Sequence, residues 1–94
     1  MDLQLENKIV LVTAASTGIG RSIAELFLNE NSNVVICSSN TDKLEKTSKE
    51  IKEKLNKEIL FHKCDINKLD EIEKTVSFVE SKLGSVNILV NNCG

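Results

Sequence analysis

The sequence predicts an α/β protein whose sheet is parallel and covered by helices on both faces. Short β-branched runs alternate with amphipathic stretches along the whole chain, which is the pattern of βαβ units. The runs are also nearly continuous in apolar residues, as expected for strands that are buried on both faces. With 94 residues the chain can form one domain at most.

The alternation predicts four strands and three helices. The strand candidates are residues 9–13, 33–37, 59–63 and 87–91. Apolar side chains recur three or four positions apart, the spacing of one helical face, in residues 19–30, 41–55 and 68–83. Right-handed crossovers would place the strands in the order 3-2-1-4, which is the first half of a doubly wound Rossmann fold plus one strand.

Single residues predict where the helices begin, end and face the sheet. Asn40 and Asn67 are the expected N-caps of the second and third helices, because an Asn side-chain oxygen can accept an unpaired backbone N–H. Gly84 is expected to follow the third helix in a left-handed conformation. On the first helix, Ile19 and Leu26 are expected to lie on the apolar stripe.

The composition argues against several classes of protein. The 12 basic and 14 acidic residues give a net charge of -2 and form no basic stripe, so nucleic acid is not an expected partner. The N-terminal apolar run, residues 9–12, is too short for a signal peptide or a membrane span. We therefore expect a cytoplasmic protein with no membrane partner. Three cysteines spaced far apart suggest buried thiols, with no disulfide framework or metal site.

The turn after the first expected strand carries the first chemical signal. Residues 13–20 read TAASTGIG and join a strand to a helix. Small side chains there let backbone N–H groups and the helix N-terminus approach a pyrophosphate. Gly18 would permit the close approach, Gly20 would permit close packing of the helix, and Ser16 and Thr17 offer hydroxyls. Taken alone, the segment also fits an ordinary β–α turn.

Three more strands are followed by small or polar residues. Ser38 and Ser39 follow the second strand, Asp65 follows the third, and the fourth runs into Asn-Asn-Cys-Gly at residues 91–94. The carboxyl ends of parallel strands meet at one edge, where open α/β sheets bind their ligands. One ligand-binding rim explains all four segments, although Asp65 could instead help to cap the third helix.

These segments resemble the classical short-chain dehydrogenases/reductases. The Thr-Gly-x-x-x-Gly-x-Gly motif of that family matches residues 13–20, except that Ala14 replaces the first glycine. Its acidic residue after the third strand matches Asp65, and its Asn-Asn-Ala-Gly motif matches residues 91–94 except for Cys93. One added methyl at Ala14 is tolerable where the backbone keeps a negative φ, so we expect a working turn.

The resemblance covers the chain from Leu5 onward and implies a role for each segment. It implies that residues 14–20 line the pyrophosphate, that the two serines border the adenosine ribose, and that Asp65 and the Ile66 backbone read the adenine. The last three residues of the chain would lie along the nicotinamide ribose. The predicted cofactor-binding residues are Thr13, Ala14, Ala15, Ser16, Thr17, Gly18, Ile19, Gly20, Ser38, Ser39, Asp65, Ile66, Asn92, Cys93 and Gly94.

The cofactor is NADP or NAD, with a slight preference for NADP. No acidic residue follows the second strand to accept the NAD 2′-OH or repel a 2′-phosphate. The basic residues that NADP-preferring family members often carry at the positions of Ser39 and Thr17 are absent as well. Lys43 lies one turn into the second helix, where it could reach a 2′-phosphate or remain a solvated lysine.

No residue of this chain is predicted to be catalytic. The family uses a serine and a Tyr-x-x-x-Lys pair, in which the lysine lowers the pKa of the tyrosine for proton exchange, and the sequence contains no tyrosine. A lone histidine within a strand, His62, is interpreted as structural.

By the resemblance, residues 1–94 are the N-terminal part of a single NAD(P)-binding Rossmann domain whose catalytic half is absent from this chain. The full-length protein would interconvert an alcohol and a carbonyl, as a ketoacyl or carbonyl reductase does, and would form a homodimer or homotetramer. The 94-residue chain alone would be inactive, and aggregation-prone because residues 88–90 form an apolar sheet edge. The alternative is a nucleotide-binding or regulatory module without redox activity. A P-loop phosphotransferase is excluded, because no Gly-Lys-Ser/Thr follows the turn.

Overall fold

The computed structural model describes residues 4–13 and 18–92, and it has the alternating α/β architecture that the sequence predicts. Each expected strand and helix is present, within a residue or two of its expected bounds. In chain order the elements are β1 (Ile9–Thr13), α1 (Gly18–Asn29), β2 (Asn33–Ser38), α2 (Thr41–Leu55), β3 (Leu60–Lys63), α3 (Leu69–Lys82) and β4 (Ile88–Val90).

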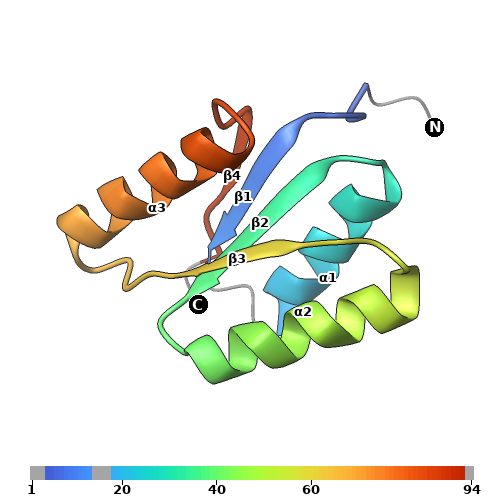
Figure 1. Cartoon of the computed structure of the whole chain (residues 1–94), viewed down its shortest axis with the longest axis horizontal. Helices are drawn as coiled ribbons and strands as arrows, with labels where there is room; N and C mark the ends of the chain where they lie inside the picture. The colour runs from blue at the N-terminus through green and yellow to red at the C-terminus, as the bar shows by residue number, and fades with distance from the viewer. Residues whose placement is uncertain (1–3, 14–17, 93–94) are drawn as a thin grey trace.

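The four strands form one parallel sheet in the order β3-β2-β1-β4. This is the predicted Rossmann order, in which β1 is central and the chain crosses to β4 by way of α3. Val12 of β1 lies opposite Ile36 of β2 on one side and Val90 of β4 on the other. All four strands therefore run in the same direction and end at the same edge of the sheet (Figure 1).

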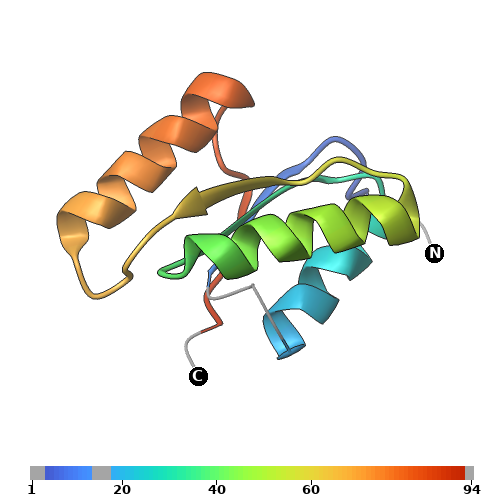
Figure 2. The same cartoon turned by 60° about the horizontal axis from the view of Figure 1, so that its bottom comes forward.

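The helices form two layers around the sheet. One layer, made of α1 and α2, lies on one face of the sheet, and α3 lies on the other face, as Figure 2 shows. Alternate residues of β1 belong to different apolar clusters: Val10 and Val12 pack with α1 and α2, whereas Leu11 packs with Val79 of α3. The period-two alternation of a strand thus gives both faces of the sheet a core.

The buried stripe of α1 differs from the one expected from its apolar residues. Gly20, Ala24 and Leu28 are the buried residues of the helix, whereas Ile19 and Leu26 are 71% and 66% exposed. Small residues at positions 20 and 24 let the helix backbone lie close to the strands. Closeness of approach, rather than side-chain size, decides which face of α1 is turned to the sheet.

The helix ends confirm two of the three expected signals. Asn40 caps α2, with its side-chain oxygen accepting the Lys43 N–H at 3.0 Å. Gly84 follows α3 with a φ of 121°, where an added Cβ would lie 3.4 Å from the Ile9 side chain. The cap expected at Asn67 is wrong: Lys68 is the N-cap residue of α3 and makes no side-chain cap, since a lysine side chain has no acceptor.

An ion-pair network joins α1 to α2 on the outer side. Arg21 contacts Glu25 at 3.0 Å and Glu50 at 2.6 Å, and Lys54 contacts Glu25 at 2.7 Å. The hydrogen bond from Lys54, together with that from Arg21, lowers the pKa of Glu25 below its ordinary value, against a smaller opposing effect of burial. In the part of the chain that the structure describes, no helix is long and apolar enough to cross a bilayer.

Candidate functional site

The predicted site residues lie where the strands end. Thr13 ends β1, Ser38 ends β2, and Asp65 lies two residues beyond the end of β3. Asn92 lies two residues beyond β4. Because the four strands are parallel neighbours, these positions share one edge of the sheet. The predicted residues at 14–17 and 93–94 lie outside the described part of the chain.

Gly18 opens α1 with a left-handed backbone. Its φ is +64°, and a Cβ added there would lie within 4 Å of no atom of the residues that the structure describes. A side chain at this position would be strained by the backbone alone, since L-residues rarely adopt that conformation. No described residue therefore occupies the space where the glycine lacks a side chain, which suits the approach of an anion to the positive end of the helix.

A hydroxyl at the end of β1 contacts the end of β4 and the residues that follow it. Thr13 is 9% exposed, and its Oγ1 lies 3.3 Å from the Val90 carbonyl oxygen and 3.2 Å from Asn91 Oδ1. The same oxygen accepts the Asn92 N–H at 3.0 Å. This threonine was predicted to bind the cofactor, and the structure gives it a positioning contact: it fixes the backbone of Asn92.

Four predicted residues line one cavity between the ends of β2 and β3. The cavity has a volume of about 210 Å³. Ser38 and Ser39 form its β2 side, and Asp65 and Ile66 form its β3 side. No acidic side chain comes from the β2 side, so the charge of the cavity comes from Asp65 alone. The residues that the resemblance assigns to the ribose and to the adenine are thus brought together.

The hydrogen bonds of the loop after β3 leave one backbone donor available. The Cys64 N–H bonds the Ser38 carbonyl at 2.8 Å. Asp65 N–H bonds the Glu71 carboxylate at 2.9 Å, and Asn67 N–H bonds the Asp65 carboxylate at 3.0 Å. Within the described residues no acceptor lies against the Ile66 N–H. A free donor beside a carboxylate matches the donor and acceptor edge of an adenine.

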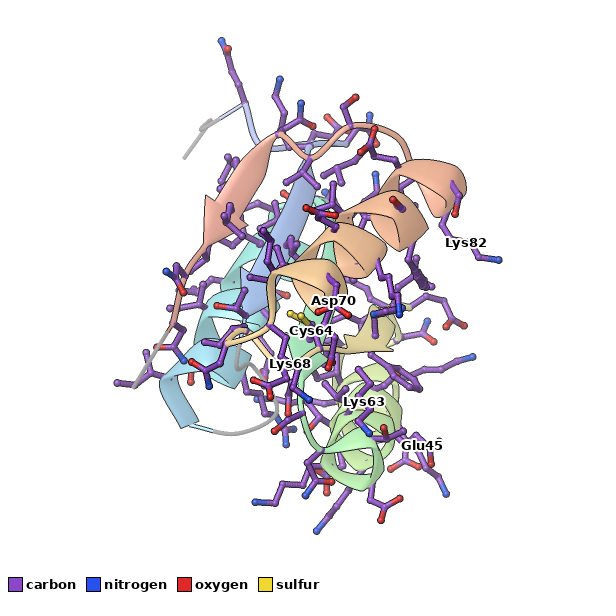
Figure 3. All side chains as sticks on the ribbon, turned by 90° about the vertical axis from the view of Figure 1, so that its left-hand side faces the viewer. Glu45, Lys63, Cys64, Lys68, Asp70 and Lys82 are labelled. Carbon is purple, nitrogen blue, oxygen red and sulfur yellow. The ribbon has the colours of Figure 1, made fainter. Side chains whose placement is uncertain are left out.

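A second, apolar cavity adjoins the first one on the α3 side of the sheet. It has a volume of about 290 Å³, and both cavities are lined by Cys64 and Ile66. Cys37 also lines it, and the thiols of Cys37 and Cys64 are both buried. Figure 3 shows Cys64 between the sheet and the start of α3, near Lys68 and Asp70. The two described cysteines therefore behave as the buried thiols that the sequence predicts.

His62 and Lys43 do not line the cavity between the ends of β2 and β3. The His62 ring contacts the Thr75 hydroxyl at 3.0 Å and packs edge-to-face on Phe78, so its role is structural, as expected. Lys43 is exposed.

Comparison with known proteins identifies the family of this chain. The family model for short chain dehydrogenases matches residues 8–94. This chain belongs to the short chain dehydrogenase family. Within that family, the 7alpha-hydroxysteroid dehydrogenase of Escherichia coli strain K12 is 37% identical over 93 residues, covering 99% of this chain and 36% of that protein. A diacetyl reductase of Staphylococcus epidermidis is 35% identical over 88 residues, covering 94% of this chain and 34% of that protein.

Solved structures of the family share the fold of this chain. The L-sorbose reductase of Gluconobacter frateurii, in complex with NADPH and L-sorbose, matches with a TM-score of 0.92 and 33% identity over 100% of this chain and 36% of that one. An actinorhodin polyketide ketoreductase with NADPH matches with a TM-score of 0.88 and 36% identity, over 100% of this chain and 35% of that one. The chain spans about a third of the length of these relatives.

Two features of the rim were not predicted from the sequence. They are the contact from Thr13 to Asn92 and the contact from Glu71 to the loop. The first depends on which hydrogen bonds the folded backbone completes, and a sequence pattern does not show that. The acidic residue at position 71 had a visible signal, because it is an acid in the first turn of the helix, six residues after Asp65.

Proposed function

We propose that this chain supplies the dinucleotide-binding part of an NAD(P)-dependent oxidoreductase that interconverts an alcohol and a carbonyl. The observation that carries the proposal is the convergence of four strand ends on one edge, with a left-handed, open Gly18 at the start of α1. Membership of the short chain dehydrogenase family supports it, as do the family structures that hold NADPH.

The described residues fit a bound dinucleotide. At one end, the space beside Gly18 and the N-terminus of α1 suit a pyrophosphate. At the other end, the cavity lined by Ser38, Ser39, Asp65 and Ile66 offers hydroxyls, a carboxylate and a free N–H for an adenosine. Both groups of residues belong to the same sheet edge, so one elongated ligand can contact them together.

This chain contributes binding and orientation to the reaction. A bound nicotinamide supplies or accepts the hydride. Asn92 is held by Thr13 at the place that the resemblance assigns to the nicotinamide ribose, so this part of the chain would set the position of the reacting ring. The proton exchange with the substrate oxygen would require a serine and a Tyr-x-x-x-Lys pair, and these 94 residues contain no tyrosine.

NADPH is the preferred cofactor in this proposal. Ser38 and Ser39 place no negative charge on the β2 side of the cavity, so nothing there repels a 2′-phosphate. The preference is small, because no arginine is present on that side to form the bidentate contact that a phosphate favours.

The whole protein is longer in this proposal, because related proteins extend well beyond the matched third. Residues 1–94 are then the N-terminal part of one domain, and the full-length protein is a cytoplasmic homodimer or homotetramer. Its substrate is a small alcohol or carbonyl compound.

Titration of the full-length protein with NADPH and NADH, followed by fluorescence, tests the proposal. We expect both to bind and NADPH to bind at least as tightly. A strong preference for NADH would overturn the assignment of the cofactor, and failure of both to bind would overturn the function.

A non-redox nucleotide-binding module is separated from the oxidoreductase by turnover. The full-length protein with NADPH is offered a panel of ketones, sugars and acyl thioesters, and absorbance at 340 nm is followed. We expect oxidation of NADPH with at least one class. Tight NADPH binding with no turnover, in a protein without a downstream Tyr-x-x-x-Lys, would favour the module.

A further inference from the structure

We propose that Glu71 is a positioning residue for the adenosine half of the cofactor, because its carboxylate fixes the backbone of the loop after β3. The proposal rests on the proposed function. Its central contact joins Asp65 N–H to Glu71 Oε1 at 2.9 Å. The residue lies on α3 and does not line the cavity that it controls.

The contact decides which backbone donor the loop offers. Glu71 takes the Asp65 N–H, and Asp65 in turn takes the Asn67 N–H through its own carboxylate at 3.0 Å. These two contacts occupy the donors on both sides of Ile66. The loop therefore presents a single N–H, that of Ile66, next to a carboxylate, and a ligand meets one defined donor and acceptor pair.

The position of Glu71 is itself fixed by β3. Thr75 is 1% exposed and donates its hydroxyl hydrogen to the Glu71 carbonyl at 2.9 Å. The Thr75 hydroxyl oxygen also lies 3.0 Å from the His62 ring Nδ1, on β3. The chain of contacts from His62 through Thr75 holds the turn of α3 that carries Glu71.

The remaining neighbours of Glu71 leave its carboxylate available for the loop. Its second oxygen lies 3.7 Å from Lys68 Nζ, and the Glu71 side chain is 26% exposed. An ionised acceptor makes a stronger hydrogen bond to an N–H than a neutral one does. Asp70 is the adjacent acid in the same first turn of α3 and is exposed, so it supplies a matched control for the charge at the start of the helix.

The test measures binding of the two halves of the cofactor to the full-length protein. ADP-ribose is the probe for the adenosine half, and reduced nicotinamide mononucleotide is the probe for the other half. In Glu71→Ala we expect ADP-ribose to bind roughly 5- to 10-fold more weakly, an effect of the size of one ordinary hydrogen bond, because the loop is no longer held in its binding conformation. The affinity for reduced nicotinamide mononucleotide should stay within about twofold of the wild-type value, because the lost contact is remote from the nicotinamide half of the site.

Two variants separate positioning from a general loss of structure. Glu71→Gln keeps an oxygen acceptor and should restore most of the affinity for ADP-ribose. Asp70→Ala removes a neighbouring charge without touching the loop and should bind ADP-ribose like the wild type. Should Glu71→Ala fold poorly, hydrogen exchange of the Asp65 amide in Glu71→Gln and in the wild type provides the readout, and slow exchange is expected in both.

Each outcome has a separate meaning. The role of Glu71 would be overturned if Asp70→Ala and Glu71→Ala lost the same affinity for ADP-ribose, or if Glu71→Ala bound both probes equally more weakly. Fast hydrogen exchange of the Asp65 amide in the wild type would overturn it as well. If the wild type binds NADPH while Glu71→Ala binds ADP-ribose normally, only this inference fails. If the wild type binds neither NADPH nor ADP-ribose, the proposed function fails and this inference fails with it.

Discussion

Replacing Thr13 by valine removes the contact that joins the ends of β1 and β4 while keeping the shape of the side chain. The hydroxyl has one hydrogen, which is shared between the Val90 carbonyl at 3.3 Å and Asn91 Oδ1 at 3.2 Å. Its oxygen also accepts the Asn92 N–H at 3.0 Å. Thr13→Val therefore loses one donated and one accepted hydrogen bond in a largely buried position.

The expected loss of stability follows from these two bonds. A hydrogen bond contributes roughly 1 kcal/mol net, so we expect Thr13→Val to lower the free energy of unfolding by about 2 kcal/mol. Thr13 is 9% exposed, so water does not readily replace the lost partners. For a protein of roughly 150–250 residues, 1 kcal/mol shifts Tm by roughly 2–4 °C, which gives a decrease of roughly 4–8 °C.

Thermal unfolding of the full-length protein, with and without NADPH, measures the effect. Thr13→Ser is the matched control, because it keeps the hydroxyl and loses one methyl, a change of about 0.8 kcal/mol. We expect Thr13→Val to lower Tm more than Thr13→Ser, and to weaken NADPH binding as Asn92 loses its anchor. This reasoning would be refuted if the Tm of Thr13→Val equalled that of the wild type, or if it were no lower than the Tm of Thr13→Ser.

Three further predictions concern the cofactor, the sheet edge and the outer ion pairs. Ser39→Arg should raise the affinity for NADPH relative to NADH roughly 10-fold through a guanidinium–phosphate contact, and an unchanged ratio of dissociation constants would remove Ser39 from the 2′ position. Residues 1–94 expressed alone should aggregate, and Leu89→Lys should increase the soluble fraction, since Leu89 is 62% exposed on the edge strand; a sharp, reversible, monomeric unfolding transition would count against this. Glu25→Gln should lower Tm at neutral pH but not well below pH 4.5, the ordinary pKa of the group. Because folding lowers the pKa of Glu25, its carboxylate stabilises the fold fully above pH 4.5 and loses this effect as the pH falls from there through the lowered pKa. A Tm difference that persists in acid would argue against the ion pair.

Much of the fold could be predicted from the sequence, because strand and helix periods depend on local spacing. The parallel order followed from the crossover rule, and Asn40 and Gly84 acted as expected at their helix ends. The face of α1 could not be predicted from apolar side chains alone. Gly20 and Ala24 are turned to the sheet and leave Ile19 exposed, because close packing favours small residues there.

The site was predictable as a set of positions, but its hydrogen bonds were not. Strand ends identified Ser38, Ser39 and Asp65, and these residues line one cavity. Asn67 was expected to cap α3, yet Lys68 is the N-cap residue, and the Asp65 carboxylate accepts the Asn67 N–H. Which partner a carboxylate takes depends on the turn that the folded loop adopts, and the sequence gives no spacing rule for it.

The most direct test of the account is a map of backbone amide shifts in the full-length protein on addition of NADPH. If one dinucleotide lies along the ends of all four strands, the amides of Gly18, Ser39, Ile66 and Asn92 should shift together with one dissociation constant. The Ile66 amide should show a large change, since its N–H gains a partner. Shifts confined to other parts of the molecule, or an Ile66 amide that does not respond, would contradict the dinucleotide site proposed at this edge.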